Sequence, residues 1–139
     1  MLKTALENIM SEDVISIKNN ATIGQVAHIL LRHRINGILV VSKDDPNEIV
    51  GIVTTTDLLR LLDDILSQQG NRMAELEVVG DMPVASVLTT NVVRVSKNTK
   101  IEKVIALMYK ENKHTIPVFD DEKLVGIIGR HDILNTAFG

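Results

Sequence analysis

The chain has 139 residues, of which 45% are hydrophobic and 24% charged, and its formal net charge is -3. This length suits one domain of common size or two very small ones. The charge balance excludes a protein that binds chiefly by neutralising phosphate backbones, and the lack of cysteine excludes disulfides, thiolate zinc sites and cysteine nucleophiles.

Apolar runs in the chain are too short to predict a membrane-spanning helix. Glu7 stands where a signal peptide would need apolar residues, so the sequence does not predict export. We therefore expect a cytoplasmic protein that binds neither a membrane nor nucleic acid.

An internal repeat organises the sequence. Segment 14–17 is matched by 92–95, which lies 78 positions later. Once three residues are removed from the loop 42–48, segment 50–53 is matched by 125–128, 75 positions later. Similarity in the same order, with one change of loop length, predicts two copies of a unit of about 60 residues.

Each copy predicts the element order β-α-β-β-α. In the first copy these elements are a strand 14–17, a helix beginning near 22, strands 38–41 and 49–53, and a helix beginning near 57. In the second copy they are a strand 92–95, a helix beginning near 99, strands 116–119 and 124–128, and a helix beginning near 132. The first helix of each copy has apolar residues at helical spacing. Thr22-x-x-Gln25 and Thr99-x-x-Glu102 predict capping boxes at its start.

This order predicts an α+β fold in which each copy is a small mixed sheet with helices on one face. A unit this small buries little, so we expect the two to pack as one pseudo-twofold pair. The predicted domains are residues 1–67 and 83–139, joined by a connector at 68–82. We interpret the connector as a surface linker, with a helical turn near 72–76 as an alternative.

The ends of the two copies resemble a known family. Gly51-Ile-Val-Thr-Thr-Thr-Asp57 and Gly126-Ile-Ile-Gly-Arg-His-Asp132 each place a glycine, two apolar residues, a turn and an aspartate that opens a helix. Ile116-Pro117-Val118 adds an apolar-Pro-Val strand. Over nearly the whole chain this pattern resembles a tandem pair of CBS domains, named after cystathionine beta-synthase and often called a Bateman module. The resemblance implies clefts between the two repeats that bind adenosine-type nucleotides, and a protein that commonly dimerises.

The motif aspartates are the predicted ribose ligands. A carboxylate such as Asp57 or Asp132 can accept hydrogen bonds from both neighbouring hydroxyls of a ribose. Hydroxyls and free N–H groups of the same turn, from Thr54, Thr55 and Thr56, could receive phosphate oxygens. The alternative is that each aspartate only caps its helix, since an acidic residue in the first turn needs no ligand.

The second copy carries more positive charge at the corresponding turn. Arg130 and His131 replace two of the threonines, and His114 lies just before a strand where relatives of this family often place a basic residue for phosphate. Asn36 is the counterpart of His114, so the resemblance does not support that contact in the first copy, where His33 and Arg34 could substitute. A solvated surface arginine is the alternative interpretation of Arg130.

Adenine needs a flat apolar slot beside backbone groups. The strand residues predicted to supply it are Val14, Ile15, Ile38, Val92, Ile116 and Pro117. The sequence predicts no metal site of its own, because His28 and His33 are off the i, i+4 spacing of a helical metal pair. Magnesium is expected only together with a bound nucleotide.

The helix predicted from Asp57 has more apolar surface than one packing face needs. Its apolar positions cover an arc of about 160° at about 100° per residue, whereas one packing face needs about 100°. They are Leu58, Leu59, Leu61, Leu62, Ile65 and Leu66. We expect the surplus to form a homodimer interface; the alternative is that the connector folds back over it.

The leading hypothesis is a stand-alone regulatory module, without catalytic activity, that binds AMP, ADP, ATP or S-adenosylmethionine and signals through an unknown effector protein. The alternative is a module that has lost its ligand and only dimerises or docks. An enzyme is the weakest of the three hypotheses, because no nucleophile elbow, P-loop or dinucleotide fingerprint is present.

Overall fold

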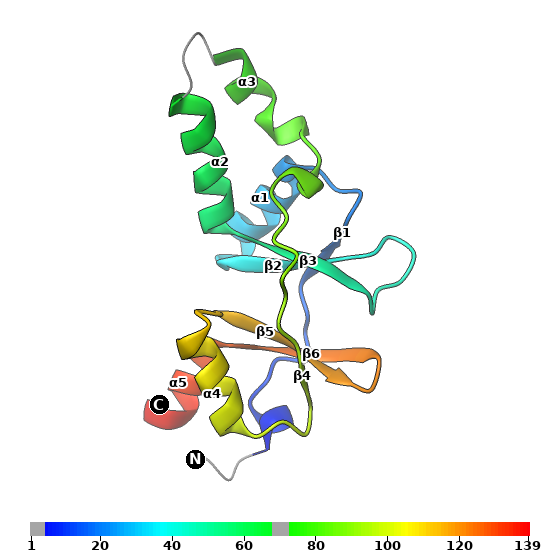
Figure 1. Ribbon diagram of the computed structural model, residues 1–139, viewed down its shortest axis with the longest axis vertical. Coiled ribbons are helices and arrows are strands. Elements are labelled where there is room, and N and C mark those ends of the chain that lie inside the picture. Colours follow the sequence, from blue (N-terminus) through cyan, green and yellow to red (C-terminus); the bar gives the residue numbers. More distant parts are fainter. Residues whose placement is uncertain (1–4, 68–72) are drawn as a thin grey trace. The chain divides into compact units, whose positions relative to one another are not determined.

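The computed structural model describes residues 5–67 and 73–139 (Figure 1). The chain divides into two compact units, Ile15–Asn91 and Met1–Val14 together with Val92–Gly139. Each unit contains one three-stranded mixed sheet with its own helices, so the predicted α+β fold is confirmed.

The unit Ile15–Asn91 has the predicted β-α-β-β-α order. Its elements are β1 (Ser16–Lys18), α1 (Ile23–His33), β2 (Gly37–Val41), β3 (Ile49–Thr54), α2 (Thr55–Ser67) and α3 (Met73–Val78), with short 3-10 turns at Val79–Asp81 and Val84–Ser86. The strand order is β1-β2-β3, with β1 parallel and β3 antiparallel to the central β2.

The other unit repeats this topology. Its elements are a 3-10 turn at Leu6–Asn8, β4 (Val95–Ser96), α4 (Ile101–Lys110), β5 (Thr115–Asp120), β6 (Lys123–Gly129) and α5 (Arg130–Phe138). Its strand order is β4-β5-β6, again with a parallel and an antiparallel neighbour around the central strand.

The two opening strands begin later than predicted. Ser16 is the first residue of β1 to pair with β2, and Val95 is the first of β4 to pair with β5. The β-branched residues that precede them, at 14–15 and 92–93, resemble strand in composition but lie outside the ladder, because composition does not fix where two strands meet.

One of the two predicted capping boxes forms. Thr22 Oγ1 accepts from the Gln25 N–H at 3.2 Å, and the Thr22 N–H donates to Gln25 Oε1 at 2.9 Å. The box predicted at Thr99 is wrong, because α4 begins after Lys100. The Thr99 hydroxyl instead accepts from the backbone N–H of Ser96, which closes the turn before the helix.

The segment before each repeat packs on the other repeat. Leu6 lies in the core beneath β4-β5-β6, whereas Val84 lies in the core beneath β1-β2-β3. The Ser11 N–H and C=O both bond to Ile127 of β6 at 2.8 Å, and Thr89 bonds in the same way to Ile52 of β3. Each unit is therefore completed by a stretch of chain that belongs to the other repeat in sequence.

These crossings explain the two motif glycines. A Cβ at Gly51 would lie 2.6 Å from the Thr89 carbonyl oxygen, and a Cβ at Gly126 would lie 2.9 Å from the Ser11 carbonyl oxygen. Only glycine lets a backbone approach so closely. The glycine that opens each motif is thus required by the fold, independently of any ligand.

The predicted spans 1–67 and 83–139 follow the sequence repeat and stay a prediction; the compact units cut the chain after Val14 and Asn91 instead. Within the connector, residues 73–81 are helical, which agrees with the predicted helical turn in part, whereas 68–72 lie outside the described residues. The connector also packs in its unit, since a Cβ on Gly24 of α1 would lie 3.0 Å from the Gly80 carbonyl oxygen.

Replacing Gly51 by alanine is expected to destabilise the protein by about 1–3 kcal/mol, because the new methyl group would overlap the backbone of the crossing segment. Thermal unfolding of the purified variant measures this. Gly37→Ala in β2 is the matched control, because its Cβ would meet neighbours only at 3.5 Å or more. Equal melting temperatures for the two variants would contradict the packing of 88–89 on β3.

Candidate functional site

Asp57 caps the junction between β3 and α2. Its Oδ2 accepts from the Thr54 N–H at 2.8 Å and from the Thr54 hydroxyl at 3.0 Å, and the Asp57 N–H donates to Thr54 Oγ1 at 3.2 Å. Its other oxygen, Oδ1, accepts from Arg60 Nη1 at 3.1 Å. With both oxygens engaged and 8% of its surface exposed, Asp57 fits the capping interpretation.

Asp132 occupies the same place at the junction between β6 and α5. Its Oδ2 accepts from the Gly129 N–H at 2.7 Å. Gly129 has no hydroxyl, and this is the one bond to the Asp132 side chain among the described residues. The half-buried carboxylate therefore keeps an oxygen, Oδ1, that can accept hydrogen bonds from a ligand.

The loop before each central strand lies against the start of the closing helix. The Thr55 N–H donates to the Asn36 carbonyl at 2.9 Å, and the Arg130 N–H donates to the His114 carbonyl at 3.1 Å. The structure thus brings residue 36 to the 54–57 turn and His114 to the 129–132 turn. We expected His114 near its motif turn from the family resemblance, but we did not expect the corresponding contact at Asn36.

Positive charge gathers at the second of these turns. Arg130 Nη2 donates to Asn112 Oδ1 at 3.1 Å, which holds the guanidinium over the end of α4. Desolvation and this nearby guanidinium lower the pKa of His114 below its ordinary value. His131 is exposed on the first turn of α5. One cation, Arg130, and two imidazoles that can donate a hydrogen bond to a phosphate therefore lie at one helix start.

The first turn differs in charge. Thr55 is half-buried and Thr56 exposed, and both are neutral. His33 and Arg34, predicted as substitutes, are exposed at the end of α1, where Arg34 adopts a left-handed conformation with φ 53°. Such a position also suits a cation next to the helix carbonyls.

The residues predicted to form the adenine slot fall into two groups. Ile38 and Ile116 are 1% and 0% exposed and pack in the two hydrophobic cores, so their backbone is what they can offer a ligand. Pro117 is buried as well. The remaining three, which precede the opening strands, are half-buried; they are Val14, Ile15 and Val92.

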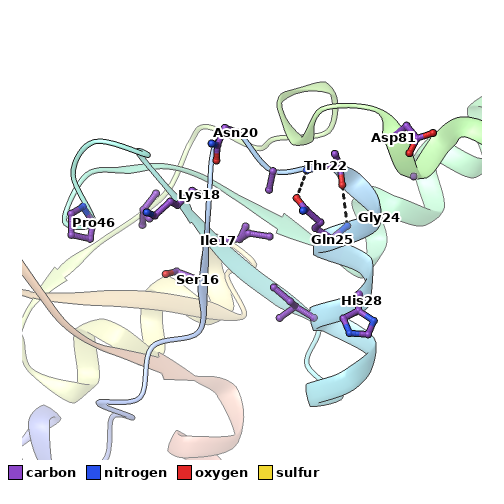
Figure 2. A pocket seen from close by; sticks show the side chains of 14 residues that line it. Ser16, Ile17, Lys18, Asn20, Thr22, Gly24, Gln25, His28, Pro46 and Asp81 are labelled. Carbon is purple, nitrogen blue, oxygen red and sulfur yellow. Dashed lines mark hydrogen bonds between the residues drawn. The ribbon is translucent and has the colours of Figure 1, made fainter.

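A groove that sequence reasoning missed lies elsewhere in the unit Ile15–Asn91 (Figure 2). It has a volume of about 980 Å³ and runs from β1 and Pro46 to the start of α1 and the turn at Gly80. Its floor includes Ile17 and Val41, and Lys18, Asn20, His28 and Asp81 are among its polar lining residues. None of the predicted ribose or phosphate residues lines it.

The corresponding place in the second unit is much smaller. There Phe119 stands where the first repeat has Val41, the guanidinium of Arg94 lies 4.4 Å from the centre of its ring, and the remaining space is about 260 Å³. Lys97 and Asp120 form an ion pair at 3.2 Å nearby. Two side chains that line this smaller space, Phe119 and Arg94, are larger than their counterparts Val41 and Ser16, and both differences are visible in the sequence.

The part of the chain that the structure describes contains no group of three or more acidic or histidine side chains placed to hold a metal ion. Over the same residues, no helix combines the length and the apolar character that a membrane crossing requires.

Comparison with known proteins agrees with this architecture. The model of the family described as CBS domain matches residues 6–64 and 84–139. Among solved structures, one similar chain is the CBS domain pair of protein MJ0100 in complex with 5-methylthioadenosine and S-adenosyl-L-methionine. It is 28% identical with a TM-score of 0.75, and the match covers 98% of this chain and 100% of that chain. CBSX2 in complex with AMP is 20% identical, with a TM-score of 0.75 over 96% of this chain and 95% of that chain.

Relatives with enzymatic names match only in part. A homoserine O-acetyltransferase of Methanococcus vannielii is 30% identical over 94% of this chain, but the match covers 24% of that protein. The chain thus spans about a quarter of the curated relative and almost the whole of the two CBS structures. Two family matches, the repeated β-α-β-β-α units and the two Gly-to-Asp junctions together show that this chain belongs to the CBS domain family, as a tandem pair of CBS domains.

Proposed function

We propose that this CBS pair is a regulatory module that binds an adenine nucleotide at the starts of its closing helices and passes the signal to an effector protein. The observation that carries the proposal is the grouping of Asp132, Arg130 and His114 at one helix start. A carboxylate with a free oxygen suits a ribose diol, and two basic groups suit the phosphate attached to it.

Relatives support the choice of ligand. The MJ0100 pair is in complex with two adenosyl compounds, and CBSX2 is in complex with AMP. All three ligands contain adenine and ribose and differ in the group at the 5′ position, so they share the features that the motif carboxylate and the half-buried strand residues would recognise. AMP, ADP, ATP and S-adenosylmethionine are the candidates, with magnesium entering only with a polyphosphate.

Regulation fits the residues better than catalysis does. The side chains at the two helix starts can accept, donate and attract charge, but they contain no nucleophile paired with a base that is itself held by a third group. We therefore propose a module without turnover of its own, whose effect passes to another protein or to a further part of a longer chain.

A second candidate function is dimerisation without a ligand. It is favoured by one observation, the stripe on α2 formed by Leu59, Leu62 and Leu66, which are 66%, 36% and 61% exposed although Ile65 on the same helix is buried. Spacing of three and seven residues places them on one face. We propose that this stripe is the homodimer interface, and it is compatible with either function.

Purified protein is expected either to carry an adenine compound or to be stabilised by one. The chain has no tryptophan and one tyrosine, so a bound adenine would dominate its absorbance near 260 nm. If the protein is empty, AMP at about 100 times its dissociation constant should stabilise the fold by roughly 2.7 kcal/mol, a shift of several degrees in melting temperature. A protein-only spectrum with no shift for AMP, ADP, ATP or S-adenosylmethionine would contradict the proposal.

The phosphate contact can be tested through pH. Because the pKa of His114 is lowered in the free protein, the imidazole must take up a proton when a phosphate that favours its charged form binds. We expect the ratio of AMP affinity to adenosine affinity, measured by calorimetry, to depend on pH differently in the two proteins. When the pH is lowered from 7.5 to 5.5, this ratio should fall less in the native protein than in His114→Asn, or should rise. Asparagine is the matched replacement because residue 36 carries it. Parallel pH profiles for the two proteins would exclude a contact to His114.

Light scattering at tens of micromolar protein is expected to give a dimer. Leu59→Asp combined with Leu66→Asp should give a monomer with little change in folding, because both side chains are already more than half exposed. Asp64→Ser on the polar side of the same helix is the control and should remain dimeric. A monomeric native protein would contradict the proposed interface.

A further inference from the structure

We infer that the groove beside β1 is a docking site for a partner protein, which adds an extended acidic segment to the edge of the sheet and inserts one aromatic side chain over Val41. The inference goes beyond the proposed function, because none of the residues predicted to contact a nucleotide lines the groove. It is carried by an open strand edge, by a space that the second repeat fills with its own side chains, and by the charges along the groove.

β1 presents an edge of the sheet to the groove. Within the described residues the strand order β1-β2-β3 gives β1 one neighbour, and all three residues of β1 line the groove (Figure 2). The Asn19 N–H donates to the Val41 carbonyl of β2 at 2.9 Å. Because successive residues of a strand direct their N–H and C=O groups to opposite edges, those of Ser16 and Lys18 point away from β2. The Ser16 N–H and C=O and the Lys18 N–H can therefore pair with an added strand.

A wall of the groove is specific to the first repeat. Pro46, which lines the groove, belongs to the loop 42–48, and the corresponding loop of the second repeat is three residues shorter. The loop is tied to the end of β1, because the Lys43 N–H donates to Asn19 Oδ1 at 3.0 Å. The groove is thus bounded by a loop that the fold holds in place beside the strand edge.

The second repeat fills the equivalent space with its own side chains. Phe119 replaces Val41 and Arg94 replaces Ser16, and the Arg94 guanidinium lies 4.4 Å from the centre of the Phe119 ring. The volume falls from about 980 Å³ in the first repeat to about 260 Å³ in the second. The fold therefore accommodates an aromatic ring at this position, and the first repeat leaves the same position open to a ring from another molecule.

The charges along the groove favour an acidic partner. Lys18 on β1 is an exposed cation, and His28 on α1 is an exposed imidazole that can donate a hydrogen bond. Asp81 is the one acidic side chain among the described residues that line the groove, and Figure 2 shows it on the connector, away from Lys18. Peptides that add to a sheet edge gain affinity from main-chain hydrogen bonds and specificity from side-chain pockets. An extended segment uses the edge, the pocket and the basic groups together, which a compact small molecule does not.

Peptide selection tests the inference. A phage-displayed library of random peptides is selected on the native protein and, separately, on Ser16→Arg with Val41→Phe, which rebuilds the filled arrangement of the second repeat. The native protein is expected to enrich peptides in which an aromatic residue neighbours an acidic one. A peptide selected in this way should bind the double variant about tenfold more weakly or worse, measured by fluorescence polarisation, because its aromatic anchor has lost its pocket. Equal binding to the two proteins, or no peptide that distinguishes them, would overturn the inference.

A surface variant keeps the test valid if the double variant does not fold. Lys18 is exposed, so Lys18→Glu should fold normally and weaken binding of the acidic peptide by about twofold to fivefold. Lys110→Glu makes the same change of charge on α4 of the other unit, where the residue is also exposed, and should bind as the native protein does. Equal affinities for these two variants would contradict docking along β1.

N-methylation of the selected peptide tests the edge itself. In a strand added to β1, alternate N–H groups of the peptide face the sheet. Methylation of residues of one parity should therefore abolish binding, whereas methylation of the other parity should leave it largely intact. Equal effects at both parities would exclude pairing with the strand edge.

AMP binding separates this inference from the proposed function. The double variant should bind AMP as the native protein does, because the groove and the helix starts share no lining residue. Loss of peptide selection with AMP binding intact would reject the docking site alone. Peptide docking without any binding of an adenine nucleotide would reject the proposed function and leave the docking site standing.

Discussion

Each closing helix depends on one carboxylate that holds its first turn to the end of a strand. The Asp57 and Asp132 side chains both accept the N–H of the residue three positions earlier, at 2.8 and 2.7 Å. Such a bond satisfies a backbone donor that a helix start would otherwise leave without a partner. It also fixes the sharp change from strand to helix, and with it the place where the preceding loop meets the helix through the Asn36 and His114 carbonyls.

The same geometry explains how one fold can serve two purposes. A cap needs one oxygen of the carboxylate, so the other oxygen is available unless further donors take it up. In the first repeat Arg60 does so, whereas the Thr54 hydroxyl donates to the same oxygen as the cap. In the second repeat the counterpart of Arg60 is Asn135, and Asp132 Oδ1 has no partner among the described residues. Divergence between the repeats therefore changes the chemistry of the site without disturbing the strand-to-helix junction.

Much of this could be predicted from the sequence, because the repeat supplies each element twice. The strand and helix order and the Thr22 capping box follow from local pattern, whereas the place of His114 beside its motif turn was expected from the family resemblance. The crossing of 88–89 over β3 could not be predicted, since nothing in the local pattern shows which sheet an apolar segment will join.

Two further features could not be predicted from the repeat. The start of α4 follows Lys100 rather than Thr99 because the Thr99 hydroxyl accepts from the Ser96 N–H instead of capping the helix. The groove beside β1 is lined in part by Gly80 and Asp81 of the connector, and the repeat pattern does not indicate that the connector packs there.

The most direct test of the central claim is the backbone N–H spectrum of isotopically labelled protein during addition of AMP. Its Gly129 amide donates to the carboxylate proposed to bind the ribose, and the Arg130 amide donates to the loop proposed to meet the phosphate. The account predicts that the resonances of residues 129–133 shift with AMP. No shift at residues 129–133 would contradict it.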